Sequence, residues 1–134
     1  GKEDAEAGER IVKQVSGNRP VFNAAGKFSL NQSASLVKQA NMVVTNDTGL
    51  MHIAAAFKRP IISIWGNTIP EFGMYPYFGK HAVPNVLYQV PALPCRPCSK
   101  LGYEKCPQGH FKCMKLIPEN EFGAVFEKKI GLGP

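Results

Sequence analysis

One short segment of the chain carries residue types that bind phosphate groups. Asp47, Thr48 and Gly49 stand together between a β-prone run and an apolar helical run, and His52 follows one helical turn after Thr48. The first amides of such a helix lack partners within it and carry partial positive charge, which attracts anions. Gly49 would let a phosphate approach the backbone, and Thr48 would donate a hydroxyl hydrogen bond. The pattern predicts a phosphate site here, with the Asp47 carboxylate capping the helix.

The same turn also has a purely structural interpretation. Asp-Thr-Gly turns cap many helices that bind no ligand. A single histidine such as His52 is more often packed or surface-exposed than a ligand. Spacing alone therefore leaves both interpretations open.

The four cysteines of the chain all lie within residues 91–115. Cys95 and Cys98 have the two-residue gap that is common in zinc sites, and Cys106 and Cys113 follow. Four thiolates can hold a tetrahedral zinc ion, but these spacings do not match a standard zinc ribbon. Structural zinc, two disulfide bonds and free thiols all stay open, although a reducing cytosol would keep the thiols reduced.

The cysteine-rich segment is also basic. Its cationic residues are interleaved with aromatic ones, and the set is Arg96, Lys100, Tyr103, Lys105, Phe111, Lys112 and Lys115. Such a mixture can bind single-stranded nucleic acid or simply be solvated.

The elements around the candidate turn predict a βαβ unit. Apolar runs at Met42–Thr45 and Ile61–Trp65 predict two strands, and Leu50–Phe57, which is apolar all round, predicts a buried helix between them. Parallel strands of this kind belong in a sheet that is covered on both faces. Ligands bind at the carboxyl ends of such strands, which is where the candidate turn would lie.

Further elements flank this unit. The sequence predicts helices at Glu3–Val15, Ser29–Ala40 and Pro118–Ile130 and strands at Pro20–Asn23 and Val86–Val90. Ser29 and Gln32 have capping-box spacing, and the last helix would dock on the core through Phe122, Val125, Phe126 and Ile130. Together the elements predict one α/β domain over residues 1–134, truncated because it begins without a strand, with a cysteine-rich loop at residues 91–115.

The composition indicates a folded protein with anionic partners. Hydrophobic residues make up 44% of the 134 residues and charged residues 19%, which excludes intrinsic disorder and suits one core. No apolar run reaches the roughly 20 residues that span a bilayer, and the polar start, Gly1–Arg10, predicts a cytosolic location unless an upstream signal has been removed. The net charge of +6 favours nucleotide phosphates, nucleic acid or anionic lipid as partners.

Several motifs, taken together, resemble a known protein family. Asn46–Ala56 closely resembles the signature of glycosyltransferase family 9, the ADP-heptose:lipopolysaccharide heptosyltransferases. Ala25–Leu30 is similar to the family's segment before the second helix, and Gly66-Asn67-Thr68 is similar to its Gly-Pro-Thr turn, with Asn67 in place of proline. The cysteines of residues 95–114 are similar to a loop of many members. The four motifs occur in the family's order along most of the chain.

The resemblance implies a fold and a set of donor-binding residues. The implied fold is a Rossmann-like parallel sheet with flanking helices, the C-terminal, donor-binding half of a GT-B fold. The segment before the second helix would place Lys27 and Phe28 against the nucleoside, and Glu3 or Asp4 would bind the ribose. The family's diphosphate-binding residues correspond to Asp47, Thr48, Gly49, Leu50, Met51 and His52.

The implied reaction is inverting transfer of a sugar from a nucleotide diphosphate, ADP-heptose, to a lipid-linked saccharide in bacterial lipopolysaccharide core biosynthesis. The helix amides, Thr48 and His52 would stabilise charge on the departing diphosphate. The family's catalytic base is an aspartate of the N-terminal domain, so this chain would hold no catalytic residue and have little activity alone. No cofactor is required for catalysis. We expect a cytoplasmic location, at the inner face of the inner membrane through peripheral contact, and no nucleic-acid partner.

Two other interpretations remain. A related transferase that uses another nucleotide sugar has the same sequence features. A zinc-stapled, basic, nucleic-acid-binding module would use the four cysteines and the basic loop. The buried βαβ core favours a transferase, because small zinc modules do not need such a core.

Overall fold

The computed structural model describes residues 1–15 and 20–118. The chain divides into two compact units, Gly1–Leu36 and Val37–Pro134, and the single domain predicted over residues 1–134 stays a prediction. The predicted helix Pro118–Ile130, with its four docking residues, lies beyond Pro118 outside the described residues.

The first unit is helical where it was expected to be. A 3₁₀ turn, η1 (Lys2–Asp4), leads into α1 (Ala5–Gln14), which together match the predicted helix at Glu3–Val15 within two residues. The side-chain amide of Asn23 donates to the carbonyl of Ala5, the first residue of α1, at 2.9 Å.

The predicted strand at Pro20–Asn23 is wrong. These residues pair with no strand among the described residues, and the Phe22 side chain is 82% exposed. The Asn23 side-chain oxygen accepts a hydrogen bond from the Ala25 amide at 3.1 Å, which turns the chain instead. An apolar run becomes a strand only where a neighbouring strand satisfies its backbone.

α2 (Leu30–Gln39) begins at the predicted capping box. The Ser29 amide donates to the Gln32 side-chain oxygen at 2.9 Å, and the Gln32 amide donates to the Ser29 hydroxyl at 3.3 Å. Each side chain thus satisfies a backbone donor of the other, as the spacing predicts.

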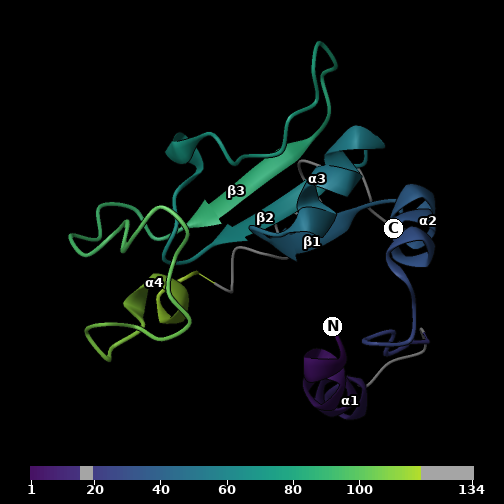
Figure 1. Ribbon diagram of the computed structural model, residues 1–134, viewed down its shortest axis with the longest axis horizontal. Coiled ribbons are helices and arrows are strands. Elements are labelled where there is room, and N and C mark those ends of the chain that lie inside the picture. Colours follow the sequence, from purple (N-terminus) through teal and green to yellow (C-terminus); the bar gives the residue numbers. More distant parts are fainter. Residues whose placement is uncertain (16–19, 119–134) are drawn as a thin grey trace. The chain divides into compact units, whose positions relative to one another are not determined.

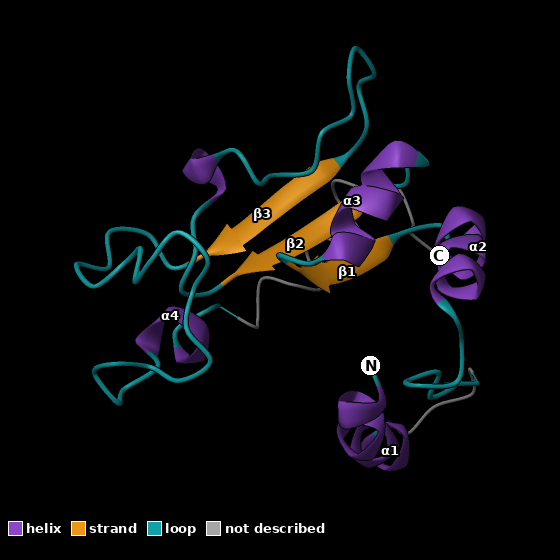
Figure 2. Cartoon of the chain, in the orientation of Figure 1, coloured by secondary structure: helices purple, strands orange, loops and turns teal. Residues whose placement is uncertain are grey.

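The second unit is built on a three-stranded parallel sheet in the order β1-β2-β3 (Figures 1 and 2). The strands are β1 (Val43–Asn46), β2 (Ile61–Trp65) and β3 (Asn85–Gln89). β1 and β2 pair with Val43 opposite Ile61, and α3 (Gly49–Ala56) connects them. The predicted βαβ unit, its parallel sheet and the α/β class are confirmed.

α3 packs on one face of this sheet. Its Met51, Ala54 and Ala55 side chains are buried with Ile61 and Trp65. The prediction that this helix is buried all round is wrong, because only one of its faces meets the sheet: Leu50 is 39% exposed.

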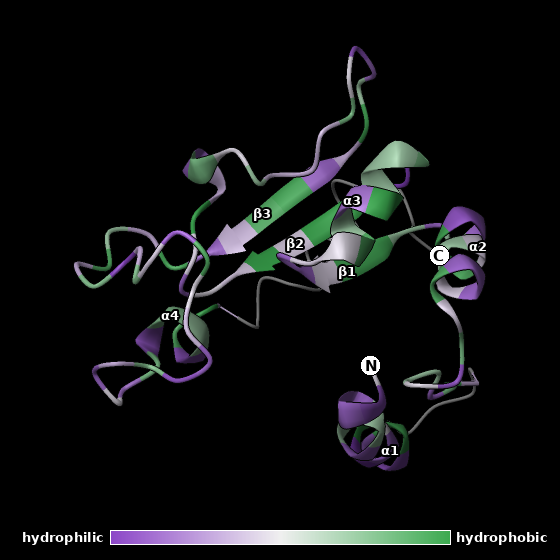
Figure 3. Ribbon diagram, in the orientation of Figure 1, coloured by the Kyte–Doolittle hydropathy of each residue, from purple (hydrophilic) through white to green (hydrophobic). Residues whose placement is uncertain are grey.

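A second apolar cluster lies on the other face of the sheet. It contains Ile62 from β2, Tyr88 and Val90 from β3 and its end, and Ile117. β2 therefore lies between two apolar layers, and Figure 3 shows the hydrophobic character of this strand. The central strand is the best-buried part of the fold, as expected for a parallel sheet.

Longer connections follow the βαβ unit. η2 (Pro70–Phe72) interrupts the connection between β2 and β3, and α4 (Lys112–Lys115) lies at the end of the cysteine-rich loop. Within the described ranges, none of the helices has the length and apolar character needed to span a bilayer.

Candidate anion-binding site

The candidate turn lies at the carboxyl edge of the sheet. β1 ends at Asn46, which pairs with Ile64 near the end of β2. Asp47 and Thr48 follow directly, and α3 begins at Gly49. The structure therefore places the turn at the edge where open α/β sheets bind ligands.

No side chain of residues 1–15 or 20–118 caps the N-terminus of α3. Thr48 occupies the N-cap position, but its side chain makes no capping hydrogen bond. Its hydroxyl lies instead 3.2 Å from the hydroxyl of Thr45. Because the amides of Gly49 and Leu50 have no carbonyl four residues back within the helix, their positive ends stay available to an external acceptor.

Met51 does not fit its predicted role completely. The amide of Met51 donates to the Thr48 carbonyl at 3.0 Å, and its side chain lies in the core with no exposure. The expectation that the first amides of this helix lack partners within it is therefore wrong at Met51. The Met51 amide already closes the first turn of α3 onto the Thr48 carbonyl.

Gly49 leaves open space at the helix start. Apart from its chain neighbours and the backbone of its own helix, a Cβ atom placed on Gly49 would meet no atom of the described residues within 4 Å. The glycine is therefore not required by packing against the described residues. The free space beside its backbone is what a closely approaching phosphate needs.

Asp47 does not cap α3, contrary to the prediction. The N-cap residue is Thr48, and the Asp47 carboxylate accepts a hydrogen bond from the Thr68 hydroxyl at 3.2 Å. Thr68 belongs to the connection after β2 and is only 6% exposed. The carboxylate thus joins the ends of two neighbouring strands.

Arg96, which the sequence indicated only as one of the basic residues of its loop, bonds to residues that follow β2 and end β3. Its guanidinium donates to the Val90 carbonyl at 2.7 Å, to the Thr68 carbonyl at 2.8 Å and to the Gln89 side-chain oxygen at 3.1 Å. Its Nε is buried with no hydrogen-bond partner among the described residues. No local pattern could have indicated these contacts, because two of the three acceptors lie on or beside β3 and the third follows β2.

His52 is exposed on α3, one turn after Thr48. Together with Lys58, Tyr77 and Phe78 it lines an open pocket of about 410 Å³. The histidine is thus accessible to a ligand rather than packed in the core.

The three residues predicted to contact the nucleoside belong to the first unit. Glu3 lies in η1, the Lys27 amide closes a turn onto the Ala24 carbonyl at 3.2 Å, and Phe28 is 45% exposed. Their contact with a nucleoside stays a prediction.

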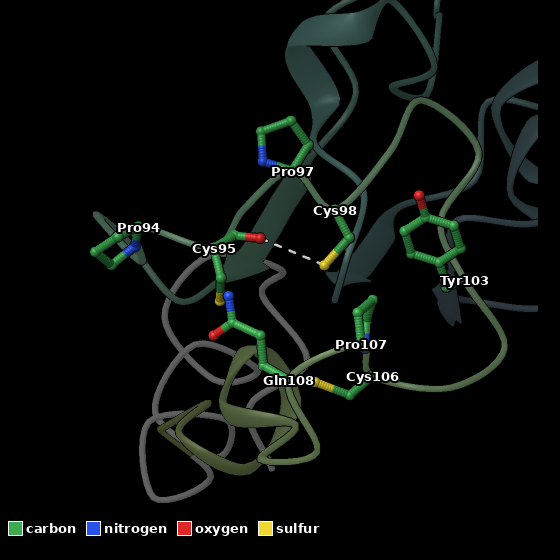
Figure 4. Close-up of a pocket in the computed structure, with 8 residues that line it drawn as sticks. All are labelled: Pro94, Cys95, Pro97, Cys98, Tyr103, Cys106, Pro107 and Gln108. Atoms are coloured by element: carbon green, nitrogen blue, oxygen red, sulfur yellow. Dashed lines mark hydrogen bonds between the residues drawn. The ribbon is translucent and has the colours of Figure 1, made fainter.

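All four cysteines carry free thiols. Cys95, Cys98 and Cys106 line a pocket of about 390 Å³ (Figure 4), and Cys113 is buried. Over residues 1–15 and 20–118, no three histidine, cysteine or acidic side chains are placed so that they could hold a metal ion. Structural zinc therefore stays a prediction without an assembled ligand set.

The thiols differ in acidity. Burial raises the pKa of Cys98 and of Cys113. The Phe111 amide, which donates to the Cys106 sulfur at 3.4 Å, is the main cause of a lowered pKa at Cys106. Cys106 is therefore the readiest of these three to form a thiolate.

Comparison with known proteins decides the family. Residues 1–103 match the family model described as glycosyltransferase family 9 (heptosyltransferase). The chain belongs to glycosyltransferase family 9. The resemblance expected from the sequence motifs is thereby confirmed.

Individual family 9 relatives match parts of the chain. Lipooligosaccharide heptosyltransferase 2 of Haemophilus influenzae is 44% identical over 71 residues, which cover 52% of this chain and 20% of that protein. Lipooligosaccharide heptosyltransferase 2 of Campylobacter jejuni is 31% identical over 112 residues, covering 82% and 32% respectively. The chain thus spans about a fifth to a third of the length of these relatives.

Solved structures of the family share this fold. The family 9 glycosyl transferase from Veillonella parvula has a TM-score of 0.69 at 22% identity, covering 98% of this chain and 35% of that one. The E. coli ADP-heptose lps heptosyltransferase II has a TM-score of 0.55 at 25% identity, covering 85% and 33%. These structures support the α/β class and its GT-B-like arrangement. The match to the family model ends before Cys106 and Cys113.

Proposed function

We propose that this chain is the donor-binding part of an inverting heptosyltransferase of lipopolysaccharide core biosynthesis, and that it binds ADP-heptose at the start of α3. The observation that carries the proposal is the uncapped helix N-terminus, where the Thr48 side chain makes no capping bond and Gly49 leaves open space. Family membership supplies the class of ligand.

The diphosphate would be held mainly by backbone groups. Its oxygens would accept hydrogen bonds from the amides of Gly49 and Leu50 and from the Thr48 hydroxyl, with His52 one turn further along. Asp47 would not bind the diphosphate directly, since an ionised carboxylate can only accept hydrogen bonds and repels a phosphate. Its bond to Thr68 suits it to hold the turn.

These groups would contact the leaving group of the reaction, which is the nucleotide diphosphate. The acceptor hydroxyl attacks the anomeric carbon of the sugar, its proton passes to a base from another part of the transferase, and the nucleotide diphosphate departs with the electrons of the broken bond. Amides that are already oriented stabilise the charge that grows on the diphosphate. The acceptor is a lipid-linked saccharide at the cytoplasmic face of the membrane, and this chemistry needs no cofactor.

Calorimetric titration of the chain with ADP, ADP-heptose and UDP tests the proposal. We expect ADP and ADP-heptose to bind, and Thr48→Ala to weaken both, because a hydroxyl donor to a charged oxygen contributes about 1.5–3 kcal/mol. Lys105→Ala, which removes an exposed charge of the cysteine-rich loop, is the matched control and should not change the affinity. A preference for UDP would change the donor class. Binding of no nucleotide would reject the donor site.

A further inference from the structure

We propose that Arg96 and Thr68 are positioning residues that hold Asp47, and with it the anion-binding turn, at the carboxyl edge of the sheet. The inference rests on the proposed function for its consequence in donor binding. Its structural part, the holding of the turn, can be measured without a ligand.

The turn that carries Asp47 contacts Thr68 directly. The hydroxyl of Thr68 donates to Asp47 Oδ2 at 3.2 Å. Since Thr68 is 6% exposed, water has little access to replace this bond. The Asp47 carboxylate is thus held by a residue that lies 21 positions later in the chain.

Thr68 is in turn bonded to Arg96. One Nη atom of Arg96 donates both to the Thr68 carbonyl and to the Gln89 side-chain oxygen, and the other donates to the Val90 carbonyl. Thr68 is therefore bonded through its side chain to the turn and through its backbone to Arg96. A planar guanidinium can make these bonds in one fixed arrangement, which a lysine ammonium cannot reproduce.

Together the contacts connect the ends of all three strands. Asp47 follows β1, Thr68 follows β2, and Gln89 and Val90 end β3. Arg96 itself belongs to the cysteine-rich segment, so one side chain anchors that segment to the edge of the sheet that carries the turn. Its acceptors are carbonyl and amide oxygens rather than a carboxylate.

The test combines hydrogen exchange of the free chain with ADP titration. In Thr68→Val, which keeps the shape and removes the hydroxyl, we expect the amides of residues 51–53, the first hydrogen-bonded ones of α3, to exchange about tenfold faster. We also expect ADP to bind about tenfold more weakly, the effect of one buried hydrogen bond. Thr68→Ser should restore both values, and Arg96→Lys should have an effect similar to that of Thr68→Val. Ser99→Ala removes a hydroxyl hydrogen bond to the Gly102 carbonyl in the same segment and should change neither.

The two readouts separate this inference from the proposed function. Faster exchange in Thr68→Val, restored by Thr68→Ser, supports the positioning role even if no form of the chain binds ADP, in which case the donor site is rejected. Exchange of residues 51–53 within twofold of the parent in both Thr68→Val and Arg96→Lys overturns the inference, whatever the affinity for ADP. If Arg96→Lys does not fold, Thr68→Val decides alone.

Discussion

At the scale of single residues, we expect a substitution at Gly49 to weaken ligand binding without lowering stability. Outside its chain neighbours and its own helix backbone, a methyl group at this position meets no described atom within 4 Å, so packing tolerates it. Alanine also favours helix over glycine by up to about 1 kcal/mol. We therefore expect Gly49→Ala to unfold at the same or a higher denaturant concentration, while ADP affinity falls at least about tenfold because the methyl group occupies the approach path. Denaturation and calorimetry on one preparation measure both. Unchanged affinity would place the anion elsewhere.

The cysteines lead to a second prediction at this scale. Hydrogen bonding from Phe111 lowers the pKa of Cys106, whereas burial raises the pKa of Cys98 and Cys113. Because the thiolate is the nucleophile, iodoacetamide should alkylate Cys106 before Cys98 and Cys113. Its rate should also level off at a lower pH than the roughly 8.5 of a free thiol. Peptide mass spectrometry of samples alkylated between about pH 6 and 9 gives the rates. Equal rates at the three thiols would contradict the assigned acidities.

At the scale of elements, α2 offers a direct test of its capping box. Ser29→Ala removes the acceptor of the Gln32 amide, which the structure shows at 3.3 Å. We expect this change to destabilise the first turn of α2 by about 1 kcal/mol, which appears as faster hydrogen exchange of residues 30–34. Ser33→Ala, inside the same helix, serves as the control and should slow exchange if anything, since alanine has the higher helix propensity. If both variants exchange alike, the box does not stabilise the helix.

The elements also show what the sequence could predict. The capping box of α2 and the strands β1 and β2 depend on neighbours a few residues away, and their prediction succeeded. The run at Pro20–Asn23 has the composition of a strand, but a strand depends on a partner that the run does not specify. Similarly, apolar residues all round α3 do not reveal that only one face of the helix meets the sheet.

In the candidate site, too, the features set by neighbouring residues could be predicted, and those set by distant residues could not. The Asp-Thr-Gly turn at the end of β1 is a local feature, and the sequence placed it correctly. The partner of Asp47 is not local: the carboxylate bonds to Thr68 rather than to the adjacent helix. Arg96 was likewise missed as a site residue, because its acceptors Thr68 and Val90 are brought to it only by the folded sheet.

At the scale of the whole molecule, burial differs sharply between the two units. In the first unit no described side chain is buried, and Ile11 and Val15 are 56% and 50% exposed. In the second unit Trp65 is fully buried, and its indole nitrogen donates to the Ser63 hydroxyl at 3.0 Å. Stability should therefore be concentrated around β2.

Hydrogen exchange followed by mass spectrometry tests this difference along the whole chain. Isolated helices as short as α1, with ten residues, are marginal in water because nucleation is costly, so its amides should exchange close to the unprotected rate. The amides of β2 should exchange at least about a thousandfold more slowly, at the rate set by global unfolding. Ser63→Ala leaves the Trp65 donor without its acceptor and should lower global stability by about 1–3 kcal/mol, accelerating exchange in β2 but not in α1. Strong protection of α1 would mean instead that the apolar side chains of Ile11 and Val15 are covered in solution, and that the stability of this chain is shared between its units.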